Sequence, residues 1–158
     1  MQTTAINMAY NFIRTKGDRM LLSLKKRFIK PVYAHCDVPC GIYETDTMTH
    51  AAATCKRMVE KYQEIGEVDS KSADSMNAAI RCVMTKEEHA RKCKEQLYLL
   101  WSDYFKPEHL EAFPNLHETF WIAAKQCGKV KQSMSLDECD KLIEMVHSIS
   151  HMFADSKK

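Results

Sequence analysis

Three residues near the start of the chain, His35, Cys36 and Cys40, bring one imidazole and two thiols together within six positions. Thiolates bind soft and borderline transition metals, and imidazole suits nickel, copper and zinc. The Cys-x3-Cys spacing is a weak motif by itself, because two such cysteines can also be structural or can pair reversibly. A zinc site would need a second Cys/His pair with ligand spacing, and the remaining histidines are scattered. The spacing alone leaves metal binding, a structural role and a thiol switch open.

The other cysteines occupy a different setting from these two. The chain has seven cysteines in all, so a framework in which every cysteine is paired is excluded. Free thiols at apolar helical positions behave as small buried hydrophobic residues, and this usage is typical of a reducing compartment. We therefore expect the remaining five to be buried and unpaired: Cys55, Cys82, Cys93, Cys127 and Cys139.

Residues 1–34 differ in charge from the rest of the chain. They carry seven Lys/Arg and one acid, a charge of +6, whereas the other residues hold sixteen bases and twenty acids, a charge of −4. We interpret residues 1–34 as a basic leader that is removed, and residues 35–158 as the functional domain. Either Met1 or Met20 can serve as the start of the leader. The body lacks the basic face that nucleic acid would require.

The leader and the apolar content also bear on location. No apolar run approaches the roughly 18 residues of a membrane span. Basic residues interrupt the N-terminal segment where a secretory signal would need its apolar region. We expect a cytoplasmic protein with no membrane partner, and the alternative is targeting to an organelle through residues 1–34.

Apolar residues at three- and four-residue spacing predict four helices and no strands. The first begins at Thr45 or Asp46, either of which can cap it, and ends at Gly66. The others cover about residues 70–105, 114–127 and 135–153. Four amphipathic helices with short links predict an all-α protein, an antiparallel up-down four-helix bundle. An irregular N-terminal segment, residues 35–45, precedes the bundle, and it contains His35, Cys36 and Cys40, which make it a candidate metal-binding hook.

Several details of these helices are open to test. The charged middle of the second helix is either a solvated face or a break, since Thr85 and Glu88 fit a capping box. We expect the third helix to stop at Gly128, and the fourth to open with a capping box of Ser135 and Glu138. The buried stripe of the second helix is predicted to be Ala73, Met76, Ile80, Val83, Ala90, Cys93, Leu97, Leu100, Trp101 and Tyr104.

Two segments of the sequence resemble one known family. Residues 35–43, HCDVPCGIY, resemble the start of mature nickel superoxide dismutases. Residues 100–107, LWSDYFKP, are similar to a second signature of that family, and the similarity continues through His109, Pro114 and Leu116-His117. Both segments occur in the family's order, and the helix count over residues 35–153 agrees with its four-helix bundle.

The resemblance implies a reaction and a ligand set. Nickel superoxide dismutases disproportionate superoxide to dioxygen and hydrogen peroxide by cycling Ni(II) and Ni(III), after proteolysis frees the histidine's α-amine. Carried over, cleavage after Ala34 frees His35, which supplies the amine and an axial imidazole. Cys36 then supplies its amide nitrogen and a thiolate, and Cys40 supplies the second thiolate. The full-length chain has a peptide bond where the amine is needed, and that nitrogen is a poor ligand.

The resemblance places further residues near the metal. Asp37 and Tyr43 match family positions beside the hook, where the tyrosine gates access and orders water. Tyr104 and Lys106, in the second segment, match positions near the same site, and a lysine favours the approach of an anion. Trp101 is interpreted as a core residue, and His109 as a structural or surface residue.

The chain departs from the family at two positions that orient the ligand histidine. A glutamate on the first helix and an arginine on the second hold that ring in the family. Here those positions are Ala51 and His89, which leaves the axial arrangement without its usual partners. His50 or His89 are the candidates to replace them.

The resemblance also implies partners. These are superoxide as the substrate, a processing protease, and other copies of the chain in a homohexamer. An alternative function is a non-catalytic helical metal-binding or thiol-switch module that uses Cys36 and Cys40 and needs no free His35 amine. A third is an inactive structural bundle that keeps the motif.

Overall fold

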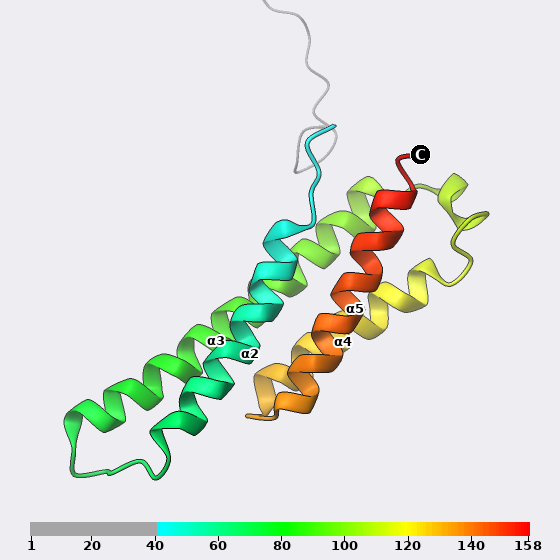
Figure 1. Ribbon diagram of the computed structural model, residues 1–158. Helices are drawn as coiled ribbons and strands as arrows, with labels where there is room; N and C mark the ends of the chain where they lie inside the picture. Colours follow the sequence, from blue (N-terminus) through cyan, green and yellow to red (C-terminus); the bar gives the residue numbers. More distant parts are fainter. Residues whose placement is uncertain (1–40) are drawn as a thin grey trace, which may run out of the picture. The chain divides into compact units, whose positions relative to one another are not determined.

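Four long α-helices form a bundle in residues 41–158, the part of the chain that the computed structural model describes. α2 (Asp46–Ile65) and α3 (Ala73–Leu99) make one antiparallel hairpin, and α4 (Leu116–Gln132) and α5 (Leu136–Asp155) make another (Figure 1). α2 packs against α3 and α5, and α4 packs against the same two helices, so the four close into a ring of neighbours. No strand occurs in this part of the chain. The predicted all-α up-down bundle is confirmed.

Two short helical segments join the hairpins. A π-helix, η1 (Leu100–Tyr104), continues directly from α3, and a 3-10 helix, η2 (Pro107–Leu110), follows it. The π-helix is closed by the Phe105 N–H, which donates to the carbonyl of Leu100 at 3.1 Å. The helix predicted to reach residue 105 is therefore continuous, but its last turn is wider than an α-turn. Such wide turns are frequent at functional sites.

The start of α2 is capped by a residue that the sequence did not single out. Neither Thr45 nor Asp46 uses its side chain as a cap, contrary to the prediction. The Glu44 carboxylate instead accepts from the backbone N–H of Asp46 and of Thr47, and from the Thr47 hydroxyl at 2.6 Å. A carboxylate at this end is also favoured by the helix dipole. Glu44 thus fixes the chain where it enters the bundle.

α3 buries a different face from the predicted one in its first half. Met76, Ile80 and Met84 are exposed, whereas Ala79, Cys82 and Lys86 are buried. Only α2 covers much of this half of α3, and the small residues Ala79 and Cys82 allow that close approach. The charged middle around Thr85 does not break the helix. The second half is packed as predicted, with Ala90, Cys93 and Leu97 buried.

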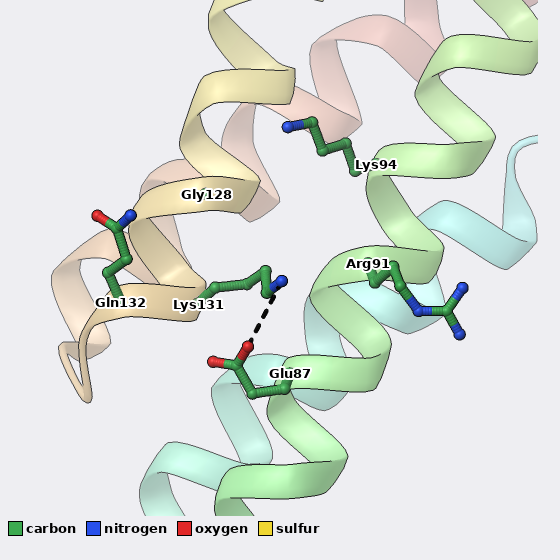
Figure 2. Close-up of a pocket in the computed structure, with 6 residues that line it drawn as sticks. All are labelled: Glu87, Arg91, Lys94, Gly128, Lys131 and Gln132. Atoms are coloured by element: carbon green, nitrogen blue, oxygen red, sulfur yellow. Dashed lines mark ion pairs between the residues drawn. The ribbon is translucent and has the colours of Figure 1, made fainter.

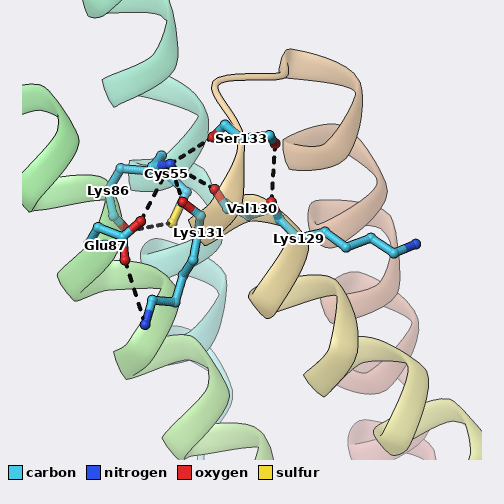
Figure 3. A network of polar contacts seen from close by, with 7 residues as sticks. All are labelled: Cys55, Lys86, Glu87, Lys129, Val130, Lys131 and Ser133. Atoms are coloured by element: carbon cyan, nitrogen blue, oxygen red, sulfur yellow. Dashed lines mark hydrogen bonds and ion pairs between the residues drawn. The ribbon is translucent and has the colours of Figure 1, made fainter.

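Lys86 is the exceptional residue of this face, because its side chain is only 2% exposed. Its ammonium donates to the carbonyl oxygens of Val130, Lys131 and Ser133 at 2.9, 2.8 and 2.7 Å (Figure 3). A Glu87 carboxylate oxygen lies 3.6 Å away. A buried ammonium is stable only with such partners, and here one lysine satisfies the free carbonyl groups at the end of α4.

This cap explains why α4 does not end where the sequence predicted. The helix runs through Gly128 to Gln132, and Val130 is fully buried beyond the glycine. A glycine favours a helix end only when nothing else stabilises the next turn. Burial of Val130 and the Lys86 ammonium stabilise that turn, so the prediction of a stop at Gly128 was wrong.

α5 opens with half of the predicted capping box. The Ser135 hydroxyl accepts from the Glu138 N–H at 3.3 Å, as predicted. The Glu138 carboxylate does not return to the cap residue. It accepts instead from the buried amide of Gln126 on α4 at 2.7 Å and from Lys141 at 2.8 Å. The glutamate therefore links the two helices of the second hairpin.

The five cysteines of the bundle are buried and free, as predicted. Four of them come one from each helix: Cys55, Cys93, Cys127 and Cys139. Burial raises the pKa of the Cys55 thiol to about 12. Interaction between the thiols of Cys93 and Cys127 raises the pKa of Cys93 and lowers that of Cys127.

Replacing Lys86 should show how much the buried cap contributes. We expect Lys86→Met to lower the free energy of unfolding by about 2–4 kcal/mol, because buried carbonyl groups lose their donor. The control is Lys92→Met, on the same helix, which removes an exposed pair with Glu88 and should cost at most about 0.5 kcal/mol. Denaturant unfolding of the full chain measures both, and equal losses would contradict the role of Lys86.

Alkylation should separate the buried cysteines from the two predicted ligands. At about pH 8 the nucleophile is the thiolate, which the raised pKa values of Cys55 and Cys93 suppress and which burial shields from reagent. We expect iodoacetamide to leave the five bundle cysteines unmodified in the native, metal-free chain and to modify them after denaturation. Peptide mass spectrometry reads out each site, and rapid labelling of Cys127 in the native chain would contradict this.

Candidate metal centre

The predicted site residues divide into two groups in the structure. His35, Cys36, Asp37 and Cys40 lie outside the described residues. Tyr43, Tyr104 and Lys106 lie within them. The fold brings Tyr43 and Tyr104, which are far apart in the sequence, into contact, with ring centroids 5.5 Å apart. The site residues that the structure describes therefore lie at the end of the bundle where α2 begins and α3 ends.

Tyr43 is fixed by what precedes and follows it. Gly41 has a φ of +93°, in the region that glycine adopts most readily. Glu44 caps α2, and Tyr43 itself is 9% exposed and belongs to the hydrophobic core. Because Tyr43 comes only three residues after Cys40, the chain is anchored immediately beyond the predicted ligands. A hollow of about 100 Å³ lies beside Tyr43, lined by Ile42, Glu44, Gln96, Leu99 and Leu100 as well.

Tyr104 ends the π-helix and meets aromatic rings on several sides. Phe153 of α5 lies 4.6 Å from it between centroids, and Phe105 lies 5.0 Å from it. Its phenol oxygen is 2.8 Å from the Ser156 hydroxyl. The Ser156 proton is directed to the Phe153 carbonyl at 2.8 Å, so the Tyr104 O–H is the donor to Ser156. The lone pairs of the phenol oxygen then remain available as acceptors.

His109 braces the segment that carries Tyr104 and Lys106. Its ring stacks on Tyr104 at 5.8 Å with an interplanar angle of 9°. Its Nδ1 accepts a hydrogen bond from the Lys106 backbone N–H at 2.9 Å, and the His109 backbone N–H donates to the Lys106 carbonyl at 3.0 Å. Since Nδ1 is the acceptor, the proton of the neutral ring lies on Nε2. The sequence interpretation of His109 as structural did not foresee that two predicted site residues depend on it.

Lys106 extends into solvent at the same end. Its side chain is 64% exposed, and its ammonium is 4.0 Å from the Glu108 carboxylate. A cation at this exposed position raises the local concentration of small anions by electrostatic attraction. Trp101, predicted as core, is only partly buried. It packs on Phe120 with centroids 6.2 Å apart and donates from Nε1 to His117 Nδ1 at 2.8 Å.

The two departures from the family pattern have clear positions. Ala51 is 2% exposed on α2, where its methyl group is part of the core. His89 is half-buried on α3, with Nδ1 2.9 Å from the Thr85 carbonyl oxygen. A carbonyl cannot donate, so Nδ1 carries the proton and Nε2 of the neutral ring is free to accept. His50 is exposed on α2, beside Ala51 in sequence.

Other hollows among residues 41–158 are lined by side chains away from Tyr43 and Tyr104. One, of about 450 Å³, lies between α3 and α4 and is lined by Glu87, Arg91, Lys94, Gly128, Lys131 and Gln132 (Figure 2). Glu87 and Lys131 form an ion pair across it at 3.6 Å. Among residues 41–158 no group of three His, Cys, Asp or Glu side chains is placed to hold a metal ion. The hook residues stay the predicted ligands, and one imidazole with two thiols is a donor set that nickel accepts.

Known proteins share this combination of sequence and fold. The sequence pattern of nickel-containing superoxide dismutases matches residues 30–157, which include the predicted ligands and both resembling segments. The chain belongs to the nickel-containing superoxide dismutase family. It is 34% identical to the nickel superoxide dismutase of Streptomyces seoulensis over 127 residues, 80% of this chain and 91% of the relative. The Streptomyces coelicolor enzyme is 32% identical with the same coverage.

Solved nickel superoxide dismutases have the same bundle. The native structure of one matches with a TM-score of 0.69 at 31% identity, covering 78% of this chain and 100% of that chain. A structure of a nickel superoxide dismutase in the oxidised state matches with a TM-score of 0.68 at 32% identity, covering 78% of this chain and 98% of that chain. The resemblance identified from two short segments of the sequence is therefore confirmed over most of the chain.

Two substitutions at His109 separate its hydrogen bond from its ring. His109→Phe keeps an aromatic ring on Tyr104 but removes the acceptor, whereas His109→Asn keeps an acceptor oxygen and removes the ring. We expect the Lys106 amide to exchange roughly five- to tenfold faster in the Phe variant, because a hydrogen bond of about 1 kcal/mol is lost. In the Asn variant, the exchange rate of the Lys106 amide should stay close to that in the unmodified chain. Amide hydrogen exchange by NMR measures this, and equal rates in both variants would refute it.

Proposed function

We propose that this chain, a nickel superoxide dismutase by family, binds its nickel through His35, Cys36 and Cys40 after cleavage between Ala34 and His35. Family membership supports the activity and the cofactor. The contact of Tyr43 with Tyr104 supports this placement of the nickel site. It joins a residue three positions after Cys40 to the second family segment. The substrate is superoxide, and two superoxide ions with two protons give dioxygen and hydrogen peroxide.

The ligand set suits this chemistry. When bound, nickel supplies one-electron redox chemistry, and two thiolates with a deprotonated amide are strong donors that favour its higher oxidation state. Pro39, between the cysteines, has no N–H and restricts the backbone. The α-amine of His35 exists only after the cut, since an intact peptide nitrogen is planar and a poor ligand. Cleavage is thus the step that completes the ligand set.

The surrounding residues control access and charge. Lys106 attracts the superoxide anion to this end of the bundle. The adjacent rings of Tyr43 and Tyr104 limit access to the site, so that only small molecules reach it. The Tyr104 oxygen can accept a hydrogen bond, because its own O–H donates to the Ser156 hydroxyl. Asp37, inside the hook, completes the proposed set. His89, with a free Nε2, is better suited than exposed His50 to meet the imidazole of His35.

Assembly, processing and location are further parts of the proposal. We propose that trimmed chains assemble as a homohexamer, and exposed apolar side chains such as Trp121, 55% exposed, and Ile122 on α4 support an interface there. A dedicated protease would cut after Ala34. Within residues 41–158 no helix is both long enough and apolar enough to cross a bilayer. Residues 1–34 are proposed as the removable leader, and the cytoplasm as the compartment.

The decisive experiment compares two forms of the chain. One begins at His35 and the other is full length, and both are reconstituted with nickel without oxygen. We expect about one nickel per chain with superoxide removal in the trimmed form, and loss of nearly all activity in the full-length form, because only the first has the amine. Metal analysis, intact mass and a superoxide assay measure this.

A third form supplies the control. A chain that begins at Ala34 also has a free amine, but one residue too early for the same chelate rings. Its superoxide removal should be as low as that of the full-length chain. Activity in a preparation whose N-terminus is intact by mass would contradict the amine-dependent hook. Nickel binding through Cys36 and Cys40 without turnover in any form would favour the non-catalytic metal-binding or thiol-switch module.

A further inference from the structure

The last turn of the chain lies against the two tyrosines. α5 ends at Asp155, and Ser156 and Lys157 follow it at the end of the bundle where α2 begins (Figure 1). The Ser156 hydroxyl oxygen accepts a hydrogen bond from the Tyr104 hydroxyl, with the two oxygens 2.8 Å apart. The Lys157 ammonium lies 3.5 Å from the Tyr43 carbonyl oxygen. Residues from opposite ends of the described chain therefore converge here.

The Lys157 ammonium has a defined position although its side chain reaches solvent. It lies 3.8 Å from the centroid of the Phe153 ring, a close cation–π contact. Phe153 in turn contacts Tyr104, with centroids 4.6 Å apart. The ammonium is thus held between the Phe153 ring, which contacts Tyr104, and the carbonyl of Tyr43. It therefore lies beside the tyrosine pair.

The charge of Lys157 is less neutralised than that of its neighbours. Lys158 forms an ion pair with Asp155 at 2.7 Å, and Lys106 lies 4.0 Å from Glu108. Lys157 makes no ion pair with a carboxylate among residues 41–158. A ring face and a carbonyl oxygen orient an ammonium without cancelling its charge, so its field extends to approaching anions.

We propose that Lys157 is a second steering cation of the site, which acts with Lys106 to draw superoxide toward Tyr43 and Tyr104. Lys106 provides an exposed charge on the η1–η2 side, and Lys157 provides a fixed one on the α5 side. Two cations that flank the tyrosine pair give a stronger attraction than either alone. This role rests on the proposed function, because it assumes that the substrate reaches the site past this pair.

Two adjacent lysines allow a matched test. Lys157→Gln and Lys158→Gln each remove one positive charge from the same turn, but only the first lies beside the tyrosine pair. We expect Lys157→Gln to lower the second-order rate constant for superoxide roughly two- to fivefold at low salt, where the Debye length is about 30 Å. The difference should vanish near 1 M salt, where that length is about 3 Å. The rate constant of Lys158→Gln should stay close to that of the parent chain at every salt concentration.

Controls separate steering from a structural role. All chains begin at His35, with nickel content and thermal unfolding measured alongside the rate. Lys157→Arg keeps the charge and should restore both the rate and its salt dependence. In the metal-free protein, acylation footprinting should show Lys157 reacting more slowly than Lys158, because its ammonium is held on Phe153.

Each outcome decides between the claims. A loss in Lys157→Gln that persists at high salt, a loss shared equally by Lys158→Gln, or no rescue by arginine would each overturn the steering role. If the parent chain carries nickel and removes superoxide while the two Gln variants are alike, the inference fails and the proposed function stands. If the parent itself has no activity, the proposed function fails first.

Discussion

The contact between Tyr43 and Tyr104 is the constraint on which the candidate site depends. The predicted nickel ligands belong to a short segment before the bundle, and such a segment has no core of its own to hold it. Tyr43 is buried three residues after Cys40, and its ring meets the end of the π-helix. Glu44 caps α2 at the next position, so the exit of the hook is fixed by packing and by a helix end together.

A second constraint lies in the middle of α3, where Lys86 is buried. One ammonium satisfies three carbonyl oxygens around the end of α4, and this permits α4 to continue past Gly128. α3 also carries the half-buried His89, and η1, which continues from α3, ends with Tyr104. α3 therefore connects the packing of the second hairpin to the predicted site. Its buried face includes the polar residue Lys86, which an apolar stripe does not predict.

The chain keeps the family's fold while changing part of its pattern. The family match spans the residues proposed to hold nickel and the two tyrosines and the lysine proposed to lie near them. Ala51 has no polar side chain and is packed in the core, so it cannot orient an imidazole. His89 offers a nitrogen lone pair at the position predicted to correspond to an arginine of the family, which donates only. An imidazole of His35 held as proposed would therefore have different neighbours from those in the family.

The sequence by itself determined the fold class, the helix count, the burial of the five cysteines and the family. Apolar periodicity is local, and the family segments are contiguous, so both can be recognised without coordinates. Tertiary structure decided what depends on contacts between distant residues: Lys86 in place of an apolar residue, and Lys157 beside Tyr43. The Glu44 cap and the His109 contacts are local, but several residues of the same types are near each helix end, and the sequence did not distinguish among them. A buried lysine such as Lys86 has the same sequence pattern as a solvated one, because its partners lie on another helix.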